Sequence, residues 1–323
     1  MNETYIGRAM PAQWIKIPHY SYGENFTSNT FLLKYKTHQE LLHTYKLEVL
    51  KKIFPNEDKL REYLQDSITF FEYISLLLPI PKLIYQDSAV LHFEEGIAYY
   101  RTKFPHGDIK TLADLTTKNR EEIALILRKI HQIDVTPYIA PIFSYKSKLL
   151  VHAWELLVSV DGLKQLKQLA WKQFRFNLEP LVQLLEQHFS LDDMSNYGKN
   201  LVFAHADIKP KNVMWLNNEI SALLHWDEMC YTTAESDFIE TLINWTIDKT
   251  QDSYHLNHQR AVEFREAYKL PLTIQPLDLA IVIARWCFYT LFCYQNEHEA
   301  GYNEGTRMFA FFDREQNFLL HLT

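Results

Sequence analysis

The stretch Phe203-Ala-His-Ala-Asp-Ile-Lys-Pro-Lys-Asn-Val-Met-Trp215 combines three regularly placed polar residues with apolar flanks. His205, Asp207 and Asn212 follow the pattern H-x-D-x-x-x-x-N. The residues on either side, 201–203 and 213–215, are apolar and predict two short buried strands. Such strands would hold the polar loop rigidly at a cleft, where a carboxylate and an amide can act on a ligand.

This spacing is typical of the catalytic loop of kinases, in which the Asp meets the acceptor hydroxyl and the Asn binds magnesium. An ordinary turn that contains a proline is the alternative interpretation. The flanking strands and a second acidic motif downstream argue against it. The loop resembles that of the aminoglycoside phosphotransferase and choline kinase family of small-molecule kinases. The resemblance covers most of the chain, although residues 203–240 carry its specific motifs.

The resemblance implies an α+β fold with two lobes, similar to that of protein kinases. Residues 1–104 would form a small, mainly β N-lobe with one helix, and residues 105–323 a larger, mainly helical C-lobe. The length of 323 residues suits two lobes. Apolar spacings of three and four predict the N-lobe helix over 58–78, before Pro79. In the family this helix carries an acidic partner for the lysine on the nucleotide phosphates.

Two lysines are candidates for that nucleotide-binding role. If residues 43–53 form a strand, Val49 and Lys51 share one face, as the kinase pattern requires. If residues 39–54 form a helix instead, the role moves to Lys34. We favour Lys51, because the helix that should follow the lysine strand begins soon after it.

Two further residues are expected on the nucleotide side. Gly23 opens the turn 23–29 between two apolar segments and is a candidate for a loop that covers the phosphates, although a plain hairpin turn explains it equally well. Phe104 lies in the segment 101–108, which Pro105 and Gly107 interrupt. By the resemblance this segment is the hinge, where adenine would contact backbone groups.

The second metal ligand is where the chain departs from the family. The family pattern I-D-W would place an aspartate at position 225, and this chain reads Leu224-His225-Trp226. Magnesium prefers hard oxygen ligands, so an imidazole is a poor substitute. Asp227 lies two residues further on, where an extended segment returns its side chain to the same face. We expect Asn212 to bind magnesium, with Asp227 as a partial ligand near His225.

The resemblance implies an enzyme that transfers the γ-phosphate of ATP to a hydroxyl group of a small molecule, with ATP and Mg²⁺ as cofactors. Asp207 would align or deprotonate the hydroxyl. The alternative is a nucleotide-binding pseudokinase without efficient catalysis, because His225 replaces the metal-binding aspartate. A protein kinase is disfavoured, because ten residues separate Asp227 from Asp237 and leave little room for an activation segment.

Composition restricts the partners. Lys and Arg number 33 and Asp and Glu 40, so the net charge is −7 and no general basic field favours a nucleic acid or an anionic membrane. Acidic residues after the loop, among them Glu240 and Glu304, favour a cationic acceptor such as an aminoglycoside or choline, with a sugar as a further candidate. Three cysteines without a C-x-x-C motif suit reduced thiols in the cytoplasm. The apolar stretch 277–294 contains Arg285, which predicts a buried helix of a soluble domain. The sequence leaves the oligomeric state open.

Overall fold

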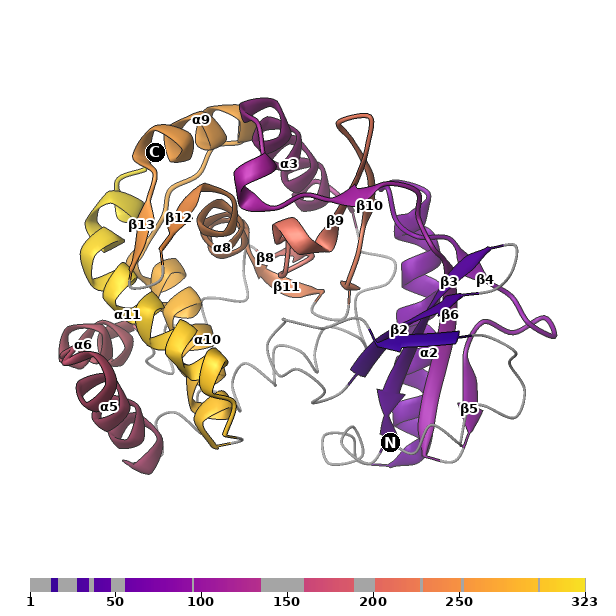
Figure 1. Ribbon diagram of the computed structural model, residues 1–323, viewed down its shortest axis with the longest axis horizontal. Coiled ribbons are helices and arrows are strands. Elements are labelled where there is room, and N and C mark those ends of the chain that lie inside the picture. Colours follow the sequence, from indigo (N-terminus) through magenta and orange to yellow (C-terminus); the bar gives the residue numbers. More distant parts are fainter. Residues whose placement is uncertain are drawn as a thin grey trace. The chain divides into compact units, whose positions relative to one another are not determined.

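The computed structural model describes residues 13–16, 28–34, 38–47, 56–94, 96–134, 160–188, 201–226, 229–250, 253–295 and 297–322. By their contacts the residues group into two compact units. The first unit comprises residues up to 108 together with 214–216 and 221–224. The second comprises residues 109–213, 217–220 and 225–323. The first is mainly β with one long helix and the second is mainly helical, which agrees with the expected α+β fold (Figure 1).

An antiparallel sheet forms the body of the first unit. Its strands follow the order β1 (Gln13–Lys16), β2 (Ser28–Lys34), β3 (Gln39–Lys46), β6 (Ile97–Lys103) and β4 (Leu83–Ile84), and β5 (His92–Glu94) also pairs with β6. In the register of the central strands, Leu41 lies opposite Leu32 on one side and Thr102 on the other. Pairing on both sides therefore fixes the position of β3.

The helix of this unit, α2 (Glu57–Ser75), begins where the sequence places a capping residue. The side chain of Asn56 accepts a hydrogen bond of 2.9 Å from the Lys59 amide, which satisfies one of the open donors of the first turn. The buried face is apolar and follows the helical period through Leu60, Leu64 and Ile68. The helix ends three residues before the predicted position 78.

The segment before α2 decides part of the choice between the two sequence-based interpretations. β3 (Gln39–Lys46) confirms the predicted strand over 43–46 and contradicts the helix considered over 39–54 in its part 39–46. Residues 48–53 lie outside the described residues, so the rest of the predicted strand stays a prediction. Local periodicity fitted both, whereas the two-sided pairing of β3 decides between them. Lys51 and Gly23 lie outside the described residues, as does the side chain of Lys34, so their roles remain predictions.

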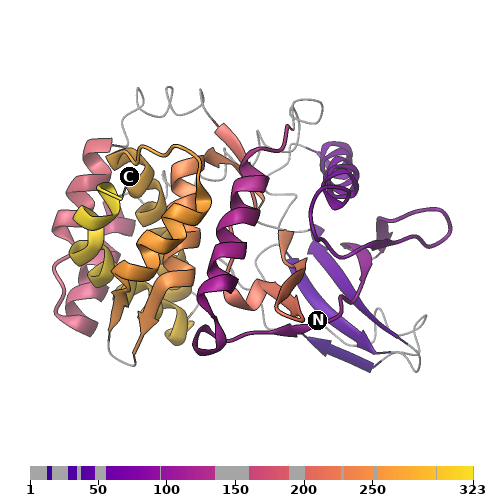
Figure 2. The ribbon, with the colours of Figure 1, turned by 90° about the horizontal axis from the view of Figure 1, so that it is seen from above.

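Helices make up most of the second unit. They are α3 (Thr117–His131), α5 (Val160–Phe174), α6 (Glu179–His188), α8 (Ala234–Thr246), α9 (His258–Tyr268), α10 (Pro276–Gln295) and α11 (Glu299–Leu320), with a short 3₁₀ turn η1 (Leu112–Asp114). α10 and α11 lie side by side (Figure 1, Figure 2). Their approach is close, because a Cβ atom on Gly305 of α11 would come within 1.8 Å of the Thr290 hydroxyl oxygen of α10.

α10 is the one described helix that is long and apolar enough to cross a membrane. Within the structure 71% of its most apolar window is buried, which indicates a core helix. Its arginine, Arg285, forms an ion pair with Glu240 of α8, with 2.5 Å between Nη1 and Oε2. A buried charge on this helix therefore has a partner inside the unit.

Short strands carry the segment that the sequence singled out. β8 (Leu201–Ala204) pairs antiparallel with β11 (Cys230–Thr233), and β12 (Ile247–Lys249) pairs with β13 (Tyr254–Leu256). β9 (Val213–Leu216) lies between β10 (Glu219–Leu223) and β7 (Asp108–Ile109). The two strands predicted around the polar loop, 201–203 and 213–215, are thus confirmed as β8 and β9.

Candidate active site

The loop between β8 and β9 is folded tightly on itself. It closes in a 3₁₀ turn, η3 (Pro210–Asn212), with backbone hydrogen bonds of 3.0 Å from the Lys209 amide to the Asp207 carbonyl and 2.8 Å from the Asn212 amide to the Lys209 carbonyl. Ala206 has a φ of +61°, a conformation that is uncommon for a residue with a side chain. The loop therefore needs support from the residues around it.

Asp207 and Asn212 meet at the centre of the loop. Asp207 is 1% exposed. The Asn212 side-chain amide donates to Asp207 Oδ2 at 2.6 Å and to the Asp207 carbonyl at 2.8 Å. Because Nδ2 faces these two oxygens, Oδ1 of Asn212 is its remaining polar atom. Asn212 thus fixes the carboxylate and keeps a neutral, hard oxygen for another ligand.

Lys209 is a third member of this site, and sequence reasoning did not single it out. Its Nζ lies 2.6 Å from Asp207 Oδ1, so the carboxylate is held at both oxygens. Burial by itself would lower the pKa of Lys209, but the negative charges of Asp207 and Glu240 raise it above its usual value. Lys209 therefore stays protonated beside the carboxylate. In the sequence, its position two residues after Asp207 could have identified it as a member of the site.

The next lysine of the loop, Lys211, is less firmly protonated than Lys209. Burial and the neighbouring charge of Lys209 lower the pKa of Lys211 to about 7. Lys211 is therefore only partly charged near neutral pH, unlike Lys209.

Side chains from two distant helices support the loop backbone. The Trp245 indole N–H of α8 donates to the Ile208 carbonyl at 2.8 Å, and Arg285 of α10 donates to the Ala206 carbonyl at 3.1 Å. Buried carbonyls need such partners. These contacts stabilise the residues on both sides of Asp207, including the strained Ala206.

His205 has a supporting position. The Asp207 amide donates to His205 Nδ1 at 3.3 Å, and the imidazole lies against the Trp226 ring with 4.3 Å between the ring centres. Nδ1 accepts a hydrogen bond and so carries no proton in this arrangement. His205 therefore orients the loop.

A second buried group joins three helices of the same unit. His131 of α3 lies 2.9 Å from Asp237 Oδ2 of α8 through Nε2, and 2.6 Å from the Tyr268 hydroxyl of α9 through Nδ1. Burial, together with the charge of Asp237, raises the pKa of Tyr268. His131 and Asp237 therefore have a structural role, since their contacts join α3, α8 and α9.

The metal ligands fit magnesium only in part. Asn212 binds Asp207 through Nδ2, which leaves its other polar atom, the hard oxygen Oδ1, as a candidate magnesium ligand. His225 is buried, with a φ of +61°, and its imidazole is a poor ligand for magnesium. Asp227 lies outside the described residues. In the described part of the chain no group of three His, Cys, Asp or Glu residues could hold a metal ion.

In the first unit, Phe104 belongs to an apolar cluster. It packs, half-buried, against Leu41 of β3, Met214 of β9, Ala222 of β10 and Leu224. The Phe104 amide already donates to the Gln39 carbonyl at 3.1 Å. Phe104 can therefore offer its ring to an aromatic base, whereas its backbone N–H is used within the sheet.

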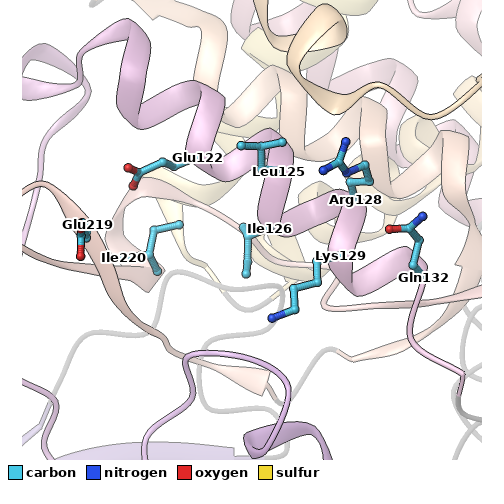
Figure 3. Close-up of a pocket in the computed structure, with 8 residues that line it drawn as sticks. All are labelled: Glu122, Leu125, Ile126, Arg128, Lys129, Gln132, Glu219 and Ile220. Atoms are coloured by element: carbon cyan, nitrogen blue, oxygen red, sulfur yellow. The ribbon is translucent and has the colours of Figure 1, made fainter.

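A pocket of about 500 Å³ in the second unit lies away from these groups. It is lined by side chains of α3 and β10, among them Leu125, Lys129 and Ile220 (Figure 3). Other residues of α3, such as Leu127 and His131, are buried. The pocket shares no residue with the Asp207 site, so we do not assign it to the chemistry of the loop.

The sequence was also compared with known protein families and known proteins. The model of a family described as the phosphotransferase enzyme family matches residues 28–269. No curated protein sequence matches the chain.

Solved structures of low sequence identity share the fold. The GDP and kanamycin complex of APH(2")-IIia is 13% identical with a TM-score of 0.59, covering 92% of each chain. An aminoglycoside-3'-phosphotransferase of type VIII is 14% identical with a TM-score of 0.55, covering 87% of this chain and 95% of the other. A thermostable mutant of APH(4)-Ia, in a ternary complex with AMP-PNP and hygromycin B, is 12% identical with a TM-score of 0.56, covering 96% and 93%. The expected two-lobed, kinase-like fold is confirmed.

Proposed function

Because the chain belongs to the phosphotransferase enzyme family, we propose that it transfers the γ-phosphate of ATP to a hydroxyl group of a small molecule. The observation that carries the proposal is the contact between Asp207 and Asn212. It joins a buried carboxylate to an amide whose free oxygen suits a metal ion. Phosphoryl transfer depends mainly on positioning and electrostatic stabilisation, which this site can supply.

In this mechanism Asp207 receives the hydrogen bond of the acceptor hydroxyl and takes its proton as the hydroxyl oxygen bonds to the γ-phosphorus. The bond between the γ-phosphorus and the bridging oxygen breaks, and ADP leaves with the electron pair. Asn212 and Lys209 hold the two carboxylate oxygens, which limits the carboxylate to one orientation. We therefore propose that Asp207 acts mainly by aligning the hydroxyl for in-line attack.

We propose that Asn212 Oδ1 and Asp227 bind Mg²⁺, with His225 at the position of a second ligand in the family pattern. When bound, the metal would neutralise charge on the nucleotide phosphates. For ATP, we propose Lys51 and Gly23 at the phosphates and the ring of Phe104 at the base. Nucleotide binding is supported by related folds, whose structures hold GDP or AMP-PNP.

The acceptor is proposed to be an aminoglycoside-, choline- or sugar-like molecule, since structures of the same fold hold kanamycin or hygromycin B. We also propose that the protein acts in the cytoplasm. The chain has three cysteines and no C-x-x-C motif, and Cys287 and Cys293 are buried in the described part, which suits a reducing compartment.

His225 favours a second candidate function, a nucleotide-binding protein with little or no catalysis. A buried imidazole at this position would weaken metal binding, and slow transfer would follow. The two candidates differ in turnover and share nucleotide binding.

Thermal melting and ADP release separate these functions. AMP-PNP with Mg²⁺ should raise the melting midpoint, because a ligand that binds the native state stabilises it. ADP release from ATP should then depend on both Mg²⁺ and an acceptor, tested with kanamycin, choline and D-glucose. A raised midpoint without any turnover would favour the pseudokinase, and an unchanged midpoint would contradict both candidates.

A further inference from the structure

The pocket between α3 and β10 lies within the second unit and has no role in the proposed chemistry. Its volume of about 500 Å³ is within the range of sites for small molecules. It is shallow, however, because Leu125 in its lining is still 38% exposed. Sites for small molecules usually enclose most of the ligand. The pocket therefore fits a ligand that is covered on one side only, such as a segment of a peptide.

Charged side chains of opposite sign lie at the two ends of this pocket, with apolar side chains between them (Figure 3). Glu122 of α3 and Glu219 of β10 form the acidic end. Arg128 and Lys129 of α3 form the basic end, and Leu125 lies between the two. Glu122 precedes Lys129 by seven residues, which corresponds to about 10 Å along a helix.

These charges are available to a ligand. The side chains of Arg128, Lys129 and Glu219 form no hydrogen bond or ion pair with any residue that the structure describes. Glu122 has one ion pair, with Lys118 at 4.0 Å, and the 70% exposure of Lys118 makes that pair weak. Burial and the nearby charge of Glu219 raise the pKa of Glu122. The acidic end therefore favours a cation that would reduce this repulsion.

The edge of β10 adds backbone groups to the pocket. β10 is an outer strand of its sheet, and in the described part of the chain no strand pairs with its other edge. Successive residues of a strand point to opposite faces of the sheet, so a pocket lined by both Glu219 and Ile220 reaches this edge. An extended peptide can pair with such an edge through backbone hydrogen bonds. The edge therefore favours a peptide over a small molecule.

We propose that this pocket binds an extended segment of a partner protein, with one basic, one apolar and one acidic side chain at alternate positions. Alternate residues of an extended chain share a face, and five residues span about 13 Å, which suits the separation of the two charged ends. The basic side chain would meet Glu122 and Glu219, and the acidic one Arg128 and Lys129. The apolar side chain would cover Leu125.

Fluorescence anisotropy of labelled peptides with the full chain tests the proposal. The probe peptide contains Lys-Thr-Leu-Thr-Glu, which places the three required side chains on one face. Two control peptides, Lys-Thr-Leu-Thr-Lys and Glu-Thr-Leu-Thr-Glu, carry charges of one sign, and a third, Lys-Thr-Ser-Thr-Glu, lacks the apolar side chain. We expect the probe to bind about tenfold more tightly than each control.

Variants with reversed charges identify the residues. Glu219→Lys should weaken binding of the probe by about tenfold and strengthen binding of Glu-Thr-Leu-Thr-Glu, because the acidic end then repels a basic side chain. Lys129→Glu should likewise strengthen binding of Lys-Thr-Leu-Thr-Lys. A merely structural defect would weaken all peptides and would not reverse the preference. Glu121→Lys, at an exposed position of α3 outside the pocket, is the matched control and should leave every affinity unchanged.

Three outcomes would overturn the inference. They are equal binding of the probe and the control peptides, no binding of the probe up to about 1 mM, and charge-reversed variants that keep the preference of the parent. The melting midpoints of Glu219→Lys and Lys129→Glu should match that of the parent, because both residues are exposed. The proposed function is tested separately by ADP release, since the pocket shares no residue with the Asp207 site.

Discussion

The ion pair between Asp207 and Lys209 allows structural and catalytic effects to be separated. Asp207→Ala removes a carboxylate from an ammonium group that is only 13% exposed. Breaking a buried pair by removing one partner costs roughly 3–5 kcal/mol, against a total stability of about 5–15 kcal/mol. Because Lys209 keeps some exposure and Glu240 lies near it, we expect a loss of about 3 kcal/mol in the free energy of unfolding.

The double variant Asp207→Ala/Lys209→Met removes both charges. Its free energy of unfolding should recover to within about 1 kcal/mol of the parent, because no uncompensated charge stays buried. Urea unfolding followed by the fluorescence of the seven tryptophans measures both changes. Neither variant should transfer phosphate. A single variant as stable as the parent, or a double variant no more stable than the single, would refute this description of the site.

Three further predictions concern the nucleotide, the metal and the loop. Lys51→Ala should raise the KM for ATP more than Lys34→Ala does, and the reverse order in steady-state kinetics would reassign the nucleotide lysine. His225→Asp should raise kcat, because a carboxylate binds magnesium better than an imidazole and aspartate tolerates the φ of +61°. Asp227→Ala should lower kcat. If neither change alters kcat, the metal site is misplaced. Trp245→Phe leaves a buried loop carbonyl without its donor, so unfolding should become easier by about 1–3 kcal/mol, and an unchanged urea midpoint would contradict this.

Local features of the site could be predicted from the sequence. The H-x-D-x-x-x-x-N spacing and its apolar flanks lie within one short stretch, so they indicated the loop and its two strands. The hydrogen bond between Asn212 and Asp207 was not predicted. The support of the loop could not be predicted in this way. Arg285 lies 79 residues from Ala206, and Trp245 lies 37 residues from Ile208, so their contacts depend on how the helices pack.

The N-lobe shows a second limit of prediction from the sequence. Residues 43–46 fit both a strand and a helix by periodicity, and the pairing of β3 with β2 and β6 selects the strand. Likewise, acidic residues such as Glu304 seemed to favour a cationic ligand, but their partners emerge only in the folded chain. Counting charges along a sequence does not reveal which of them are paired.

Direct detection of a phosphorylated acceptor tests the central claim. The parent and Asp207→Asn, which keeps the size of the side chain, are incubated with ATP, Mg²⁺ and kanamycin, choline or D-glucose, and the products are analysed by mass spectrometry. The parent should add one phosphoryl group to an acceptor, and Asp207→Asn should do so about 10²–10⁴ times more slowly while it still binds AMP-PNP. Equal rates of transfer by the two proteins would contradict the assignment of Asp207 as the catalytic residue.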